Sequence, residues 1–499
     1  MEEDIKDGEV PTEQKINEIE QKRREKLDNL KAAGKNPYLI ERYDVKNHSK
    51  EIKDAFEILE GKKVKIAGRI MANRHMGKAS FIDLQDKDGK IQVYIRKDAI
   101  GDEAYTDFLT YDIGDILGIE GEVFKTRHGE ISVKATDVLL LSKSLRVLPN
   151  KWQGLKDTEL KYRRRYIDLI MNPDVVEIFK KRTKIIKEIK RFLEEDYDYI
   201  EVDTPILTTI AGGASARPFE TYHNTLDLDM KLRISNELPL KRLIVGGLDR
   251  VYEMGKMFRN EGIDKNHNPE FTSIEFYQAY SNLEDMMELT EKLVESVALK
   301  VNGKTKILYD GKEIELKAPW KRISMVDALK EKTGIDFNEI KTDKEAKKII
   351  EENNIEVEDF QEITWGTALA LLFEKYCEDD LIQPIFITEH PIDISPLAKK
   401  DPRDPRLTRR FEAYINGWEI ANAFSELNDP IDQLERFTKQ QSQLDAGDDE
   451  AHPMDMDYVY ALEVGLPPTG GEGIGIDRLT MLITGVKSIR DIILFPTMK

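Results

Sequence analysis

The sequence is poor in the residues and runs that several classes of protein require. Its 499 residues include a single cysteine, Cys377, which excludes an intrachain disulfide and a zinc site built from several cysteines. Its seven histidines form no HExxH pair. It holds no run of about 18 apolar residues and no apolar N-terminal segment before a small-residue cleavage site. We therefore expect no membrane span, no secretory signal and a cytoplasmic location.

Two common nucleotide-binding signatures are also missing. No GxxxxGK[ST] segment occurs, and the glycine-rich segment 470–479 fails GxGxxG because the third glycine would fall on Ile476. These absences exclude a P-loop and a Rossmann site. The glycines instead suit a strand that a flat ligand approaches closely, with Arg478 at the start of the following helix, where phosphate binds well.

Positive charge is scarce overall, with a formal net charge of -19. That balance argues against a nucleic-acid partner, because phosphate contacts need Lys and Arg. However, the acidity lies in the C-terminal two thirds, and the first 150 residues are near balance. Local basic patches, including the segment 161–165, therefore leave room for a polyanion.

Length and pattern predict two folded parts. Residues 1–61 are expected to hold a polar, disordered start (residues 1–10) and a helix from Thr12 to Ala33. On that helix we expect basic side chains at the surface: Lys22, Arg23, Arg24, Lys26 and Lys31. The pattern leaves open whether this helix docks on the protein or lies on RNA.

Residues 62–148 are expected to form an OB-type β-barrel. Five alternating segments predict its strands, Val64 to Arg74, Ala79 to Gln85, Lys90 to Arg96, Ile113 to Lys125 and Ile131 to Leu141. Phe81 and Gln92 fall on the second and third strands, where such barrels bind oligonucleotides, and Glu130 precedes the fifth. Phe81 is either a platform for an unpaired base or part of the barrel core.

The polar, arginine-rich segment 149–170 is expected to be a linker to a domain of residues 171–499. Asn172 and Pro173 begin a long helix, with more apolar positions than one face needs, so some are expected to meet a partner subunit. A strand is predicted from Tyr199 to Pro205 and another from Met230 to Ile234. Residues 282–300 and 325–376 are predicted to be mostly helical, the second as an insertion.

The segment from Phe258 to Phe271 reads as two strands joined by a charged loop. Arg259 closes the first strand, and its planar fork of donors suits phosphate oxygens. An anionic ligand is one interpretation, and a solvated hairpin tip is the other.

A second hairpin carries two carboxylates. Asn416-Gly417 predicts a two-residue turn in which Tyr414 faces Glu419 and Glu412 faces Ala421. Glu412 and Glu419 then share a face and suit Mg²⁺, unless they are two solvated glutamates. Asn422, Phe424 and Glu426 join that face only if a bulge resets the alternation between Glu419 and Asn422.

Together these motifs resemble the class II lysyl-tRNA synthetases of the bacterial and eukaryotic type. The long helix with the strand ending at Pro205 matches motif 1 of that family, the segment 258–271 matches motif 2, and 473–478 matches motif 3. Segments 212–219 and 424–429 match stretches of the lysine enzymes. The resemblance covers the chain from about Pro11 onward.

The resemblance implies an α+β fold, with an anticodon-reading OB barrel and a core built on a mostly antiparallel sheet flanked by helices. It implies ATP-dependent attachment of L-lysine to tRNA(Lys) through a lysyl-adenylate, by a homodimer closed by motif 1, with Mg²⁺ held by Glu412 and Glu419. Arg259 and Arg478 would be the catalytic residues and would hold the α- and γ-phosphate regions of ATP. The remaining implied roles are ATP binding by Arg259, Glu261, His267, Asn268, Phe271, Glu412 and Arg478, lysine binding by Gly213, Glu237, Glu275, Tyr277, Asn422, Phe424 and Glu426, and anticodon binding by Phe81, Gln92 and Glu130. Asn266 stands where many bacterial relatives carry Arg, so its role stays open.

Three features of the sequence distinguish a lysine enzyme from related proteins. Glu237, Glu275 and Glu426 would make the amino-acid pocket anionic, which favours a lysine side chain over aspartate. A silent RNA-binding relative would have no need of Arg259, Glu412, Glu419 and Arg478 together. An enzyme that lysylates an elongation factor would lack the OB domain.

Overall fold

The computed structural model describes residues 13–149, 158–355, 357, 363–445, 447, 451 and 453–499. The expected disorder of residues 1–10 and the first part of the expected linker, 150–157, lie outside the described residues. The chain divides into two compact units, Met1–Pro173 and Asp174–Lys499, each with its own core. No helix in the described parts of the chain is both long and apolar enough to cross a membrane.

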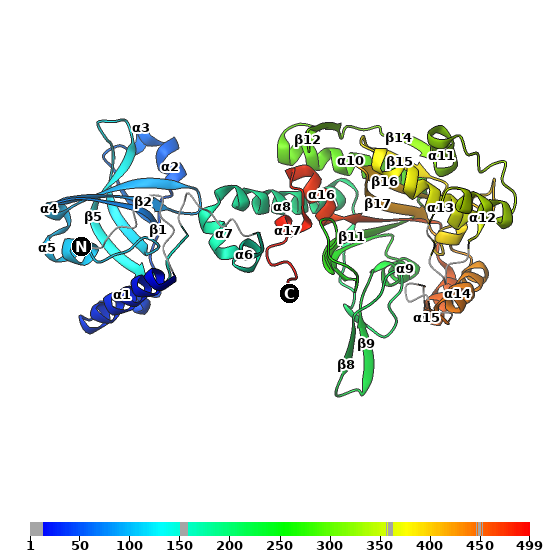
Figure 1. Ribbon diagram of the computed structural model, residues 1–499, viewed down its shortest axis with the longest axis horizontal. Coiled ribbons are helices and arrows are strands. Elements are labelled where there is room, and N and C mark those ends of the chain that lie inside the picture. The colour runs from blue at the N-terminus through cyan, green and yellow to red at the C-terminus, as the bar shows by residue number, and fades with distance from the viewer. Residues whose placement is uncertain are drawn as a thin grey trace. The chain divides into compact units, whose positions relative to one another are not determined.

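The first unit is built on a closed five-stranded barrel with strand order β1-β2-β3-β5-β4 (Figure 1). Its strands are β1 Lys63–Met76, β2 Ala79–Gln85, β3 Lys90–Arg96, β4 Ile116–Lys125 and β5 Ile131–Ser142. Inward residues such as Ile82, Val93 and Val133 are fully buried. The predicted OB barrel is therefore confirmed. The fourth strand begins at Ile116, not at Ile113, because Asp115 accepts the backbone N–H of Asp112 and holds a turn there.

One long helix and several short ones pack around the barrel. They are α1 Glu13–Ala32, η1 Pro37–Leu39, α2 Ser49–Asp54, α3 Phe56–Leu59, α4 Lys97–Ile100 and α5 Asp102–Phe108. α1 docks on the barrel through Leu30, and Lys26 forms an ion pair with Asp112. The expectation that Arg23 is exposed was wrong. Arg23 is 6% exposed because its guanidinium donates to the backbone carbonyls of residues 144 and 146.

The described part of the expected linker is not extended. It forms two short helices, α6 Thr158–Arg163 and α7 Arg165–Met171. Arg165 is buried and forms an ion pair with Asp168, which orders the second of them.

The second unit is organised by an eight-stranded mixed sheet, ordered β14-β15-β16-β17-β18-β11-β10-β6. Its strands are β6 Ile200–Glu201, β10 Arg250–Phe258, β11 Glu270–Ala279, β14 Lys321–Ser324, β15 Ile385–Thr388, β16 Arg410–Ile415, β17 Trp418–Ser425 and β18 Thr469–Gly475. Its pairings are antiparallel except at the ends, where β6 and β14 run parallel to their neighbours. The predicted combination of an α+β core and an OB barrel is confirmed.

Helices cover both faces of this sheet (Figure 1). α8 Pro173–Arg191, α10 Leu283–Asn302 and α16 Ile476–Thr484 share the larger core with the sheet. α9 Glu237–Val245, α14 Pro430–Asp445 and α15 Met456–Gly465 pack on the opposite side, against Val251 and Tyr277. The alternation of β11 explains this division, because Phe276 points into one core and Tyr277 into the other.

Three further helices and several short elements complete the second unit. The predicted helical insertion contains α11 Met325–Thr333, α12 Asp343–Glu352 and α13 Trp365–Tyr376, which share a core of their own. The others are η2 Phe192–Asp196, β7 Leu207–Thr208, β8 Glu220–His223, β9 Leu228–Leu232, β12 Lys306–Tyr309, β13 Lys312–Glu315, η3 Glu378–Asp380, η4 Ile392–Ile394 and α17 Ile489–Ile492.

Two strand predictions need correction. The strand expected from Tyr199 to Pro205 is reduced to Ile200–Glu201, because β6 pairs with only two residues of β10 before Pro205. The strand expected from Met230 to Ile234 runs from Leu228 to Leu232, in a small sheet ordered β7-β9-β8.

The β16–β17 hairpin has the predicted turn and the predicted bulge. Tyr414 pairs with Glu419, but Ala413 pairs with Ala421, so Ile420 is the extra residue between Glu419 and Asn422. The expected pairing of Glu412 with Ala421 was wrong because the bulge shifts the register by one, and Glu412 pairs with Asn422 instead. The bulge thus brings Glu412, Glu419, Asn422 and Phe424 to one face of the sheet.

Candidate functional site

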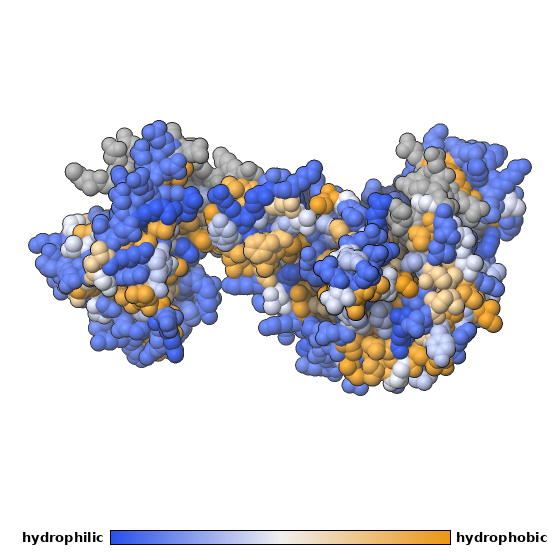
Figure 2. Space-filling view, turned by 90° about the horizontal axis from the view of Figure 1, so that it is seen from below, coloured by the Kyte–Doolittle hydropathy of each residue, from blue (hydrophilic) through white to orange (hydrophobic). Residues whose placement is uncertain are grey.

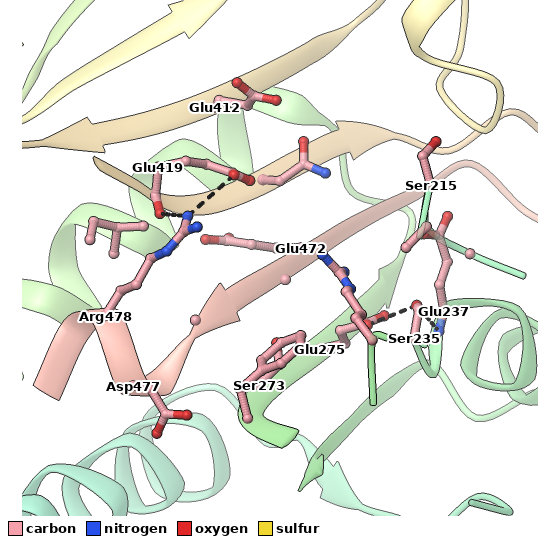
Figure 3. A pocket seen from close by; sticks show the side chains of 18 of the residues that line it. Ser215, Ser235, Glu237, Ser273, Glu275, Glu412, Glu419, Glu472, Asp477 and Arg478 are labelled. Carbon is pink, nitrogen blue, oxygen red and sulfur yellow. Dashed lines mark hydrogen bonds and ion pairs between the residues drawn. The ribbon is translucent and has the colours of Figure 1, made fainter. Parts of the chain in front are cut away.

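A cavity of about 370 Å³ lies in the second unit, over the face of the sheet that carries α9. The loop between β10 and β11, β11 itself, the β16–β17 hairpin, β18 and α16 all contribute residues to its lining (Figure 3). Its lining includes fourteen of the residues proposed above, namely Gly213, Glu237, Arg259, Glu261, His267, Asn268, Phe271, Glu275, Tyr277, Glu412, Glu419, Asn422, Phe424 and Arg478. Glu426 lies behind the wall and does not line the cavity.

Arg259 follows the end of β10 and is held there by the loop that returns to β11. Its backbone N–H donates to the carbonyl of Pro269, and its guanidinium carbon lies 5.1 Å from the centre of the Phe271 ring. Asn268 is buried, and its side-chain amide donates to the Glu270 carbonyl, which fixes the loop where it enters β11. The arrangement presents a cation and an aromatic face together at the cavity.

Arg478 enters from the first turn of α16 and organises the neighbouring groups. It donates to the backbone carbonyl of Glu419 at 2.8 Å (Figure 3). It also lies 3.1 Å from Nε2 of His267. Arginine only donates, so Nε2 must accept, and Nδ1 carries the hydrogen that it donates to Asp264. Burial opposes ionisation of Asp264, but hydrogen bonds from His267 and from the backbone N–H of Asn266 hold its pKa below its usual value.

The two carboxylates proposed as metal ligands lie on one face of the β16–β17 hairpin. Glu412 forms an ion pair with Arg410 at 2.6 Å, and Tyr414 donates a hydrogen bond to it. Glu419 lies 3.5 Å from Arg478. Tyr414 also contacts Glu378, whose pKa is raised to about 7 by burial and by Glu412 and Glu419.

This donor set suits Mg²⁺ in its chemistry. Glu412 and Glu419 are hard oxygen donors that face the same cavity, and the negative charge that collects around Tyr414 favours a divalent cation. In the part of the chain that the structure describes, no cluster of three or more His, Cys, Asp or Glu side chains is arranged to hold a metal. Two carboxylates would leave the other coordination positions to phosphate oxygens and water.

The other end of the cavity is lined by buried carboxylates. Glu275 accepts hydrogen bonds from the Ser235 hydroxyl at 2.9 Å and from the Tyr277 hydroxyl at 3.0 Å. Burial, together with the charge of Glu237, raises the pKa of Glu275 to about 7. Gly213 closes this end with a φ of +90°, and a Cβ there would lie 2.7 Å from the Ser235 hydroxyl oxygen.

The carboxylates of this pocket are accompanied by a buried cation that the sequence analysis did not predict. Lys241 is fully buried, lies 2.5 Å from Glu237 and also forms an ion pair with Glu426. Sequence reasoning missed it because no helix was predicted after Glu237. An (i, i+4) helical spacing would have placed Lys241 beside that glutamate.

Several residues that line the cavity were also missed, among them Arg410 and Ser235. Arg410 lines the cavity and donates to Asn422 at 2.9 Å as well as to Glu412, and its position two residues before Glu412 on a strand was the available signal. Ser235 was not predicted either, and no pattern in the sequence identified it.

The glycines of β18 differ in how closely other protein atoms approach them. A Cβ on Gly471 would lie 2.1 Å from a carboxylate oxygen of Glu426 and 2.4 Å from the Tyr277 ring. On Gly475 the nearest atom would be 3.9 Å away. Gly471 is therefore required by the packing of Glu426 and Tyr277, a reason that differs from the expected approach of a flat ligand.

The proposed anticodon residues lie on the outside of the barrel in the first unit. Phe81 is half-buried and stacks on Tyr94, with ring centres 4.6 Å apart, so it is not a core residue. Tyr94 in turn contacts Phe124, and Gln92 accepts a hydrogen bond from Ser132. Glu130 is exposed and precedes β5. Tyr94 and Phe124 extend an aromatic surface for which only Phe81 was predicted.

Comparison with known proteins gives consistent results for both units. Residues 157–499 match the family model described as tRNA synthetases class II (D, K and N), and residues 64–141 match the OB-fold nucleic acid binding domain. The chain is 58% identical over 486 residues to a lysine–tRNA ligase of Thermoanaerobacter pseudethanolicus, with 97% of each chain covered. It is 54% identical over 488 residues to the lysine–tRNA ligase of Clostridium tetani, covering 98% of this chain and 97% of the relative.

The matches extend over both units and over every element that lines the cavity. The chain belongs to the class II tRNA synthetases, among the lysine–tRNA ligases.

Proposed function

We propose that this protein attaches L-lysine to tRNA(Lys) in two steps, through a lysyl-adenylate. The observation that carries the proposal is the cavity of the second unit, in a chain more than half identical over nearly its full length to lysine–tRNA ligases. The cavity offers arginines at one end and buried carboxylates at the other. These are the groups that would recognise a triphosphate and a cationic amino acid.

In the first step, a carboxylate oxygen of lysine attacks the α-phosphorus of ATP, and the bond to pyrophosphate breaks. The carboxylate is ionised at pH 7 and needs no general base. Arg259 and Arg478 stabilise the negative charge that develops on the phosphates, so catalysis is by positioning and electrostatics. Glu261, His267, Asn268 and Phe271 hold the nucleotide.

Glu412 and Glu419 would hold Mg²⁺, which supplies further neutralisation of the phosphate charge when it is bound. Before it binds, Arg410 and Arg478 partly compensate these two carboxylates.

In the second step, the 3′-hydroxyl of the terminal ribose of tRNA attacks the activated carbonyl, and AMP leaves. The aromatic surface of the barrel, with Gln92 and Glu130 beside it, receives unpaired anticodon bases. We expect the reaction in the cytoplasm, where translation uses its product.

The lysine side chain is placed at the end of the cavity that holds Glu237, Glu275 and Tyr277. Buried carboxylates attract an ammonium and repel the carboxylate of aspartate. Gly213, Asn422 and Phe424 complete this end, and Glu426 acts from behind it.

We further propose that the protein is a homodimer joined through motif 1. Four apolar side chains near β6 and β7 are 40–51% exposed in the single chain, namely Ile200, Ile206, Leu207 and Ile210. Figure 2 also shows apolar side chains gathered at the surface of the second unit. Exposed apolar surface of this kind supports a contact with a second copy.

Aminoacylation of purified tRNA with a panel of amino acids tests the proposed reaction. We expect lysine-dependent ATP–pyrophosphate exchange and formation of lysyl-tRNA(Lys). Exchange that is stimulated by aspartate and not by lysine would contradict the proposal.

A further inference from the structure

Lys241 is a charged residue in the centre of the second unit that the reaction described above does not use. It lies on α9, its side chain is 0% exposed, and its ammonium group lies 2.5 Å from Glu237 on the same helix. Across from α9 the same ammonium forms an ion pair with Glu426, which follows β17 and is also 0% exposed. One buried cation therefore joins two elements that build the amino-acid end of the cavity.

Glu426 depends on this ion pair. Both of its carboxylate oxygens are buried, and apart from the ammonium group of Lys241 no donor among the described residues forms a hydrogen bond with either oxygen. A buried carboxylate without a compensating charge takes up a proton instead. Lys241 is the compensating charge that the structure provides.

Aromatic rings enclose the rest of the ammonium group. The centres of the Phe424, Tyr458 and Tyr277 rings lie 5.2, 5.8 and 5.9 Å from it. These rings exclude water and strengthen the electrostatic interactions inside the cluster. Burial alone would lower the pKa of Lys241, but Glu237 and Glu426 outweigh that effect and raise it, so Lys241 stays charged.

The titratable and charged groups around Lys241 and Glu237 come from four further elements or segments. Glu275 and Tyr277 face it from β11, Tyr458 from α15 and Arg410 from β16, while Glu426 follows β17. Burial raises the pKa values of Glu237 and Glu426 above those of free carboxyl groups, and Lys241 is the largest influence that opposes this rise. Without Lys241, the mutual repulsion of Glu237, Glu275 and Glu426 would add to the effect of burial.

We propose that Lys241 is a positioning residue of the amino-acid pocket, which fixes Glu237 and Glu426 as carboxylates and so prepares the pocket for a cationic side chain before substrate arrives. This inference rests on the proposed function, because it takes lysine as the substrate. Lys241 acts through Glu237, which lines the cavity, and does not itself line it.

The test compares Lys241→Met with the wild type in ATP–pyrophosphate exchange. Methionine keeps a similar length and removes the charge. We expect KM for lysine at pH 7.5 to increase about tenfold or more, while kcat and KM for ATP stay within about threefold. Lys292→Met is the matched control, because Lys292 forms an exposed (i, i+4) ion pair with Glu288 and its loss should leave KM for lysine unchanged.

The pH profile separates positioning from a merely structural role. Between pH 7.5 and 8.5 the wild-type KM for lysine should change less than about twofold, since on this inference the ion pairs with Lys241 hold Glu237 and Glu426 ionised. In Lys241→Met it should fall about fivefold or more over the same range, because a proton must first leave the carboxylate cluster. Lys241→Arg should restore the wild-type profile. A Lys241→Met enzyme with the wild-type profile would overturn the inference.

If Lys241→Met does not fold, the pH dependence of the wild-type KM for lysine still tests the inference. A wild-type KM for lysine that falls more than about fivefold between pH 7.5 and 8.5 would mean that the carboxylates are not held ionised, and would overturn the inference. A wild type without lysine-dependent exchange would overturn the proposed function and this inference together. Failure of the inference alone leaves that exchange intact.

Discussion

At the scale of single residues, the cavity divides its charges between two ends. Arg259 and Arg478 stand on different elements and reach one end, while Glu237 and Glu275 line the other. A substrate pair with one anionic and one cationic partner matches this division. Each end can therefore be changed separately by a single substitution.

Arg259 is the residue whose geometry is hardest to replace. Arg259→Lys keeps the positive charge but loses the planar fork that can contact two phosphate oxygens. We expect kcat in ATP–pyrophosphate exchange to fall by about 100-fold or more, as for the loss of other transition-state donors. Arg403→Lys is the control, because Arg403 is 66% exposed and lies outside the cavity lining. A variant at position 259 with near-normal kcat would exclude the proposed role of Arg259.

Glu275 should make lysine recognition depend on pH. Its pKa of about 7, raised by burial and by Glu237, means that it is largely neutral below pH 7 and negative above it. The charged form attracts the substrate ammonium, so KM for lysine should fall about fivefold from pH 6 to 7 and about twofold from pH 7 to 8. Initial rates of exchange against lysine concentration give this profile.

The matching variant is Glu275→Gln, which cannot ionise. Its KM for lysine should be higher than that of the wild type above pH 7 and independent of pH between 6 and 8. If the variant keeps the wild-type profile, the titrating group lies elsewhere.

At the scale of elements, β18 shows how a strand makes room for a pocket. Gly471 faces Glu426 and Tyr277 so closely that a methyl group cannot fit without displacing them. We expect Gly471→Ala to destabilise the protein by about 1–3 kcal/mol through overpacking and to increase KM for lysine. Thermal unfolding and exchange assays measure the two effects. For stability, Gly475→Ala is the control, since its Cβ would meet nothing closer than 3.9 Å, and an equal loss of stability there would contradict the packing argument.

Much of the β16–β17 hairpin could be predicted from the sequence, but its exact register could not. The period of two and the Asn-Gly turn gave the β16–β17 hairpin, and the need to place Glu419 and Asn422 on one face required the bulge. The predicted partner of Glu412 was wrong by one residue. A bulge adds one unpaired residue to a strand, and no pattern in the sequence marks how it shifts the pairing. Lys241 was missed for another reason: no helix was predicted after Glu237, and its second partner, Glu426, is brought to it by tertiary packing.

The outer surface of the barrel carries a prediction for tRNA. Phe81, Tyr94 and Phe124 form a half-buried row in which the first two rings stack at an interplanar angle of 24°. Tyr94→Ala should increase KM for tRNA about tenfold or more, since stacking on one base is worth about 1–3 kcal/mol. Lysine-dependent exchange without tRNA should be unchanged. Loss of exchange in this variant would show that the barrel surface has another role.

At the scale of the whole molecule, the two units separate recognition from chemistry. The cavity is built from residues of the second unit alone, and the aromatic surface belongs to the first. Family resemblance predicted this division, and the barrel strands were also predictable from their alternation. The exposure of apolar residues around β6 was less predictable, because a sequence pattern does not distinguish a strand buried in the core from one buried only in a subunit interface.

That exposure leads to a prediction about assembly. Ile206 and Leu207 are each 45% exposed in the single chain, and transfer of such side chains into a subunit interface is favourable. We expect the wild type to have twice the mass of the 57.6 kDa chain in light scattering after size exclusion. Leu207→Asp should shift the protein towards the monomer by placing an unpaired charge in the interface. Leu308→Asp, at a 66% exposed position on β12, is the control and should leave the mass unchanged. A wild type that is monomeric at micromolar concentration would show that these side chains serve another contact.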